Sequence, residues 1–204
     1  MIGVIGPLVQ GKRELRGSVR SVAVFALGAV VGAAITGALI GVLAAAVQGL
    51  AGEGVRAVAV GVTGCLLLLA DLGALGLRTP TLRRQTCSTW YRERGAGFAW
   101  PLWGFDLGLG FSTIRLSSLY WLMVLFVAAF VSPVLAPVAL AFYGLGLGVA
   151  VAAAVVAQAW SPVSPNASPG LGLVRAAGRV KLASVAFLGA VSIAIVFSRG
   201  APWT

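Results

Sequence analysis

The feature that most constrains this chain is the uncharged run "SVAVFALGAVVGAAITGALIGVLAAAVQGL" at positions 21–50. About 20 predominantly apolar residues are enough for a helix to cross the hydrocarbon core of a bilayer, so this run predicts a membrane span. Composition agrees, because 59% of the residues are hydrophobic, only 10% are charged and the mean hydropathy is +1.00. A soluble domain needs more charge to cover its surface. The sequence therefore predicts an all-α, polytopic transmembrane helix bundle.

Apolar segments recur along the chain and predict about five spans. They lie at about residues 21–48, 57–77, 107–131, 138–159 and 182–197. We interpret the chain as a single transmembrane domain with two spans in 21–77, a basic cytoplasmic loop in 78–106 and three spans in 107–204. Residues 1–20 hold a short apolar stretch and a basic cluster. The apolar stretch is too short to span, and whether residues 1–10 enter the membrane stays open.

The distribution of basic residues predicts the orientation in the membrane. Loops 11–20, 78–94 and 170–181 are basic, whereas 49–56 and 132–137 are nearly neutral. Cytoplasmic loops carry an excess of Lys and Arg. We therefore expect a multi-pass protein of a bacterial cytoplasmic membrane, with the N-terminus and the three basic loops in the cytoplasm. The richness in Ala, Gly, Val and Arg is typical of a high-GC bacterium.

The net charge of +10 does not indicate nucleic-acid binding. The basic residues lie in loops between apolar segments, not on a folded face with interleaved aromatic rings. The partners we expect are membrane lipids and either further copies of the chain or other membrane subunits. Thin, glycine-rich helices enclose a path poorly unless other helices join them.

Side chains that carry catalytic chemistry are scarce, so the sequence leans away from an enzyme. Histidine is absent and there are two cysteines, which excludes a His/Cys metal cage. The carboxylates are Glu14, Glu53, Asp71, Glu93 and Asp106. So few acids disfavour acid–base catalysis by a carboxylate pair. We expect no catalytic residues, no metal and no cofactor.

The two cysteines are candidate redox thiols. Cys65 lies in the middle of the second span and is interpreted first as a small core residue. Cys87 lies in the loop with five arginines, which would stabilise its thiolate. If residues 65–77 are helical, the two are about 18 Å apart along the membrane normal, and a disulfide needs a large movement. A thiol oxidoreductase is the least favoured hypothesis.

Small residues at four-residue spacing predict close helix packing. In the first span one glycine pair lies roughly opposite a second pair, so neighbours can approach this helix on two sides. The fourth span repeats the pattern. The glycines concerned are Gly28, Gly32, Gly37, Gly41, Gly144 and Gly148. Close packing is the simpler interpretation, and a helix that lines a path or slides against a neighbour is the functional one.

Asp106 and Arg115 bring opposite charges into the third predicted span. They are nine residues apart, so in one straight helix they point to opposite sides. Asp106 would then share a polar face with Gly110, Thr113 and Ser117. One interpretation is that this stripe lines a hydrated cavity. The other places Asp106 at the cytoplasmic interface, together with Trp100 and Trp103.

Asp71 lies about two helical turns before Arg78, which is too deep for a loop residue. It is the natural partner to test for Arg115, because pairing lowers the cost of each charge inside a membrane. The alternative is interfacial exposure with nothing bound.

The order of parts carries a family resemblance. "IGPLVQG" precedes a basic cluster and a glycine-rich span, and "FDLGLGF" leads into "VSPVLAP" and another glycine-rich span. This order resembles the transmembrane domain of the CcdA/DsbD-type reductant transporters and their sulfite-exporter-like relatives. The resemblance implies two inverted three-helix repeats, degenerate here because the first leading helix is nearly missing. Redox members carry a cysteine beside proline in each repeat, whereas "IGPLVQG" and "VSPVLAP" hold none.

Two functions follow as hypotheses. The first is a transporter-type protein that moves a small solute or reducing equivalents along a path lined by small and polar residues. That path, or a buried ion pair, would involve Asp71, Asp106, Thr113, Arg115 and Ser117. The alternative is a non-catalytic membrane subunit or anchor of a larger membrane complex. The solute and the oligomeric state stay open.

Overall fold

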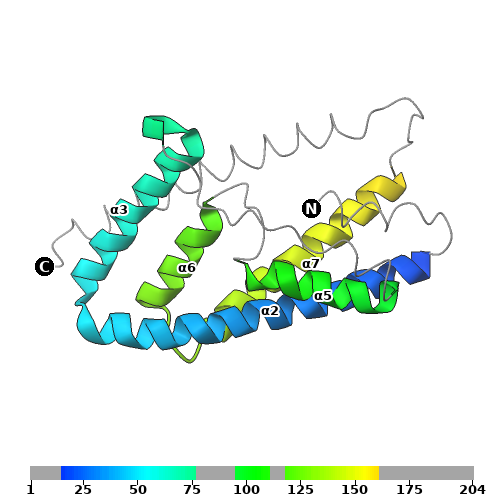
Figure 1. The fold of residues 1–204 in the computed structure, drawn as a ribbon, viewed down its shortest axis with the longest axis horizontal. Helices are drawn as coiled ribbons and strands as arrows, with labels where there is room; N and C mark the ends of the chain where they lie inside the picture. The colour runs from blue at the N-terminus through cyan, green and yellow to red at the C-terminus, as the bar shows by residue number, and fades with distance from the viewer. Residues whose placement is uncertain (1–14, 77–94, 111–117, 161–204) are drawn as a thin grey trace, which may run out of the picture. The chain divides into compact units, whose positions relative to one another are not determined.

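The computed structural model describes residues 15–76, 95–110 and 118–160, and all regular structure in these residues is helical (Figure 1). This confirms the predicted all-α class for the described residues. In chain order the elements are α2 (Leu15–Leu50), α3 (Glu53–Leu72), the 3-10 helix η1 (Ala74–Gly76), α5 (Ala96–Leu109), α6 (Leu119–Phe130) and α7 (Ala136–Trp160).

Three of the described helices are long and apolar enough to cross a membrane. They cover Val19–Leu50, Glu53–Leu72 and Ala136–Ala153. These are the first, second and fourth predicted spans, and they indicate a membrane location. The fifth predicted span, 182–197, lies outside the described residues, as do residues 1–14 and the basic loop residues 78–94.

The third predicted span, 107–131, is wrong as a single helix. α5 ends at Leu109 and the next residue, Gly110, has a φ of 81°, a backbone conformation that glycine adopts without steric cost. α6 begins only at Leu119. With 14 and 12 residues, the two helices are about 21 and 18 Å long, well short of the hydrocarbon thickness of about 30 Å. The predicted loop 78–106 is also wrong from Ala96 onward, where α5 begins.

The described helices belong to two compact units. The first unit contains α2 up to Leu39 together with α5 and α7. The second unit contains α2 from Ile40 onward together with α3, η1 and α6. Each unit has its own core and its own buried carboxylate.

In the first unit, α5 supplies most of the buried cluster, α2 supplies Phe25 and Ala29, and α7 supplies Val151. The buried cluster consists of Phe25, Ala29, Ala99, Trp100, Trp103, Leu107 and Val151. The rings of Trp100 and Trp103 meet edge to face, with centroids 5.1 Å apart. At 4% and 2% exposed, these rings fill the protein core, which the interpretation as interfacial aromatics did not anticipate.

The backbones of α2 and α5 touch along a stripe of glycines. A methyl group placed on Gly28 would lie 2.1 Å from the carbonyl oxygen of Pro101, and one on Gly32 would lie 2.3 Å from that of Phe105. From the other side, Gly104 and Gly108 approach carbonyl oxygens of α2 equally closely. Residue numbers rise together on both helices, so α2 and α5 run parallel, with a Gly-xxx-Gly pair on each.

α7 approaches a second side of α2. A methyl group on Gly144 would lie 2.4 Å from the carbonyl oxygen of Ala29, and one on Gly37 would lie 2.6 Å from that of Ala136. Gly148 similarly meets Ala26. Numbers rise on α2 as they fall on α7, so these two helices are antiparallel. Within the first unit, α2 is therefore the central helix.

In the second unit, α3 and α6 pack side by side (Figure 1). Their buried cluster consists of Val60, Leu67, Leu122 and Ala129, flanked by partly buried Leu68, Leu119, Trp121, Leu125 and Phe130. Every residue in this cluster is aliphatic or aromatic, so packing alone does not fix the position of α6 along α3. The polar contacts at the two ends of α6 fix its position along α3.

Candidate functional site

Asp71 holds the N-terminal end of α6. Its side chain is only 1% exposed, near the end of α3. One carboxylate oxygen accepts the backbone N–H of Ser118 and the other accepts its hydroxyl, both at 2.8 Å. Ser118 is the N-cap residue of α6. The first backbone N–H groups of a helix have no partner within the helix and carry a partial positive charge, so a carboxylate there is favourable.

Two donors from other helices hold the C-terminal end of α6. The side-chain amide of Gln48 donates to the carbonyl oxygens of Val131 at 2.9 Å and Ala128 at 3.2 Å. The guanidinium of Arg56 donates to the carbonyl oxygen of Ala129. It also lies over the ring of Phe130, 6.0 Å from the ring centroid. Carbonyls of the last helical turn have no intrahelical donor, so these contacts satisfy groups that lipid cannot.

The charges at the ends of α6 therefore match its dipole. Asp71 is at the positive end and Arg56 is at the negative end, and both come from α3. A charge of the right sign at a helix end contributes about 0.3–1 kcal/mol at an exposed site and up to about 2 kcal/mol when partly buried. The antiparallel pair α3–α6 is thus fixed in register by one acid and one base separated by the length of α6.

Asp106 is buried in the first unit. It lies near the end of α5, one turn before Gly110, and is 6% exposed. This burial places Asp106 inside the protein, and its level relative to the membrane interface stays a prediction. Asp71 is 1% exposed and accepts two hydrogen bonds from Ser118, so the alternative of interfacial exposure with nothing bound is wrong for Asp71.

The proposed polar stripe through the third span is not formed as one helical face. Gly110 ends α5, so Asp106 and Arg115 do not share a straight helix. Thr113, Arg115 and Ser117 lie outside the described residues, and the proposed pairing of Asp71 with Arg115 stays a prediction. Among the described residues, Ser118 donates two hydrogen bonds to Asp71.

The glycines singled out in the sequence lie at the helix contacts described above. Gly28 and Gly32 face α5, whereas Gly37, Gly144 and Gly148 lie between α2 and α7. Gly41 is buried as well. Three further contributors escaped the sequence analysis, namely Gly104, Gly108 and Thr36. The Thr36 hydroxyl donates to the carbonyl oxygen of Leu109 at 2.9 Å, which caps the C-terminus of α5. The four-residue spacing of Gly104 and Gly108 could have predicted a close helix contact in this segment.

Cys65 is not a core residue, because it is exposed on α3. Cys87 lies outside the described residues, so the structure does not describe the distance between the two thiols. Among the residues that the structure covers, no group of three or more His, Cys, Asp or Glu side chains is placed to hold a metal ion.

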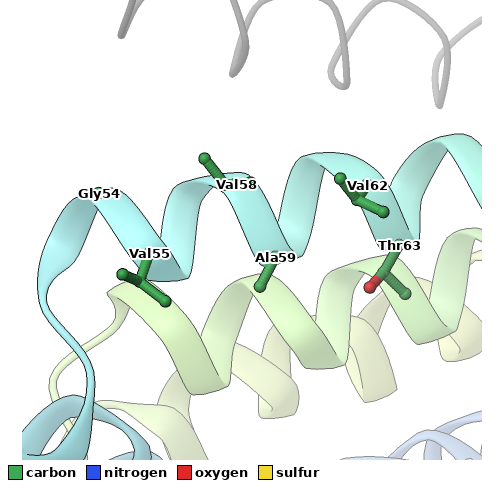
Figure 2. Close-up of a pocket in the computed structure, with 6 residues that line it drawn as sticks. All are labelled: Gly54, Val55, Val58, Ala59, Val62 and Thr63. Carbon is green, nitrogen blue, oxygen red and sulfur yellow. The ribbon is translucent and has the colours of Figure 1, made fainter.

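A shallow apolar groove runs along α3. It is lined by Gly54, Val55, Val58, Ala59, Val62 and Thr63, which Figure 2 shows on successive turns of the helix. Helical phase places this face largely on the side of α3 away from Val60 and Leu67, which pack against α6. Among the described residues, α6 therefore packs on the side of α3 away from this groove.

The part of the chain that the structure describes is all-helical, with three helices that could span a membrane and with Asp71 and Asp106 buried. Comparison of the sequence with protein-family models, with curated proteins and with solved structures finds no match.

Proposed function

We propose that this chain is a membrane protein of transporter type that moves a small solute across a bacterial cytoplasmic membrane. The observation that carries the proposal is that two consecutive apolar helices, α5 and α6, are each too short to span and each has a buried carboxylate at one end. Discontinuous helices with polar groups at their ends form the substrate and ion sites of many transporters. Buried ionisable groups inside a membrane mark such pathways.

Asp106 is the residue assigned to the path, and Asp71 is assigned to holding α6. Asp71 already accepts two hydrogen bonds from Ser118, which suits an anchoring role. The CcdA/DsbD-like resemblance agrees with a transporter built from inverted repeats. Because the family's cysteines are missing from both proline motifs, a small solute is favoured over reducing equivalents.

Thiol accessibility tests the proposal without knowledge of the solute. Asp106→Cys is made in a Cys65→Ser, Cys87→Ser background and treated with a small, charged, membrane-impermeant thiosulfonate in intact cells and in inverted vesicles. A hydrated path predicts that the thiol reacts. Leu107→Cys is the matched control, because Leu107 is the neighbouring residue, is also 6% exposed and packs in the apolar core. If both thiols are equally unreactive from both sides, the transporter assignment is withdrawn.

The second candidate is a non-catalytic membrane subunit, and the length of α2 favours it. The apolar part of α2 covers 32 residues, or about 48 Å of helix, against a hydrocarbon thickness of about 30 Å. Large apolar side chains are exposed along its length, including Leu27, Leu39 and Leu50. Tilting buries part of such an excess, and a partner protein can cover the rest. A stoichiometric partner in gently solubilised membranes would favour this function.

A further inference from the structure

The groove on α3 carries an inference that goes beyond the proposed function and does not depend on it. Three apolar side chains of the groove are so exposed that either lipid or another protein segment must cover them. Val55, Val58 and Val62 are 65%, 66% and 56% exposed. Gly54 and Ala59 leave room between them, and the groove is almost entirely apolar.

The lining residues form two parallel rows at four-residue spacing. One row is Gly54, Val58 and Val62, and the other is Val55, Ala59 and Thr63. Rows of this kind are the ridges between which the side chains of a second helix pack. The valley between two rows of small and β-branched residues fits a helix that also presents small residues every four positions.

The chain itself supplies such a segment. Residues 182–197, "LASVAFLGAVSIAIVF", form an apolar stretch that lies after the last described helix. It carries alanines at 186, 190 and 194, which is the four-residue spacing of the groove. As a helix it would be about 24 Å long, comparable to the length of α3. We propose that this C-terminal segment packs antiparallel to α3 in the groove.

The charges at the ends favour the antiparallel direction. Arg199 follows the segment, and Glu53 lies in the first turn of α3. An antiparallel arrangement that sets Ala190 beside Val58 also sets Ala186 beside Val62 and Ala194 beside Gly54. It brings Arg199 to the end of α3 that carries Glu53, where opposite charges attract. A parallel arrangement would separate them by the length of the segment.

Disulfide trapping in native membranes tests this packing with the full chain. In the Cys65→Ser, Cys87→Ser background, Val58→Cys with Ala190→Cys and Val62→Cys with Ala186→Cys are expected to form intramolecular disulfides on mild oxidation. Leu66→Cys with Ala190→Cys is the matched control, because Leu66 is exposed on the same helix but lies two turns out of register. Its intramolecular product should be absent.

Two cysteine pairs are tested so that one variant that fails to fold does not decide the result. Gel filtration in detergent identifies the variants that are folded. Disulfides between chains through Val58→Cys alone would assign the groove to a second copy and overturn the proposal. Folded variants without any disulfide would leave the groove to lipid or to another protein, which overturns it equally. A parallel arrangement would instead form disulfides in two other pairs, Val58→Cys with Ala186→Cys and Val62→Cys with Ala190→Cys. Disulfides in these two pairs alone would contradict the antiparallel arrangement.

Discussion

Asp71 and Ser118 are 47 residues apart in the chain and share two hydrogen bonds of 2.8 Å, one to the backbone N–H and one to the hydroxyl of the serine. This contact ties the end of α3 to the beginning of α6. An isolated apolar helix of 12 residues has little reason to stop and start where α6 does. The carboxylate gives it a fixed starting point.

Removing the carboxylate should loosen α6. Asp71→Ala eliminates both hydrogen bonds, and because bonds to a charged group contribute about 1.5–3 kcal/mol each, we expect a loss of about 2–4 kcal/mol in the free energy of unfolding. Ser118→Ala removes only the hydroxyl bond and should cost less. A double-mutant cycle in mixed detergent micelles should give a coupling energy of about 1 kcal/mol or more. Additive effects would mean that the two side chains do not interact.

The other end of α6 makes a separate prediction. Arg56→Met keeps an unbranched apolar stem but removes the donor to Ala129 and the charge near Phe130. We expect a loss of about 1–2 kcal/mol in the free energy of unfolding, measured in the same micelle system. Arg20→Met is the control, because Arg20 is exposed on α2. A similar loss in both variants would assign the effect to net charge and not to the helix end.

Two glycines of α7 should respond oppositely to the same substitution. A methyl group on Gly144 would lie 2.4 Å from the carbonyl oxygen of Ala29, whereas one on Gly146 would meet nothing within 4 Å. Gly144→Ala must force α7 away from α2, and we expect it to destabilise by about 1–3 kcal/mol. Gly146→Ala should be neutral or stabilise by up to about 1 kcal/mol, because alanine favours helix. Thermal unfolding of the two variants decides between them, and equal melting temperatures would contradict the packing described.

The hydroxyl of Thr36 gives the mildest prediction. Thr36→Val keeps the shape of the side chain but loses the hydrogen bond to Leu109, so we expect a loss of about 1 kcal/mol in the free energy of unfolding. Thr36→Ser retains the donor and should lose less. If valine is tolerated as well as serine, the hydroxyl contributes nothing to the end of α5.

The helices that are apolar throughout their length could be predicted from the sequence, and the polar contacts between them could not. The runs that became α2, α3 and α7 exceed the length that lipid requires, so hydropathy alone identifies them. α5 ends at a glycine with positive φ, and in the sequence Gly110 looks like any other glycine in a glycine-rich chain.

The candidate site was predicted in part. The depth of Asp71 and Asp106 in apolar sequence pointed to unusual carboxylates, and both are buried. The contact of Asp71 with Ser118 was not predicted from the sequence, where charge alone suggested Arg115, and the pairing with Arg115 stays a prediction. Ser118 stands before the apolar run of α6, which is the position of an N-cap. Its bond to Asp71 joins residues that only the fold brings together.

The brevity of α6 also has a consequence for biosynthesis. A stretch of 12 apolar residues gives a weak signal for entry into lipid, and the bare ends of its backbone would oppose entry further. Both ends are covered by Asp71, Arg56 and Gln48, which all precede it in the chain. The ribosome therefore delivers the covering groups first, and α6 can settle against helices already in place. The order of synthesis therefore allows α6 to assemble after the groups that cover its ends.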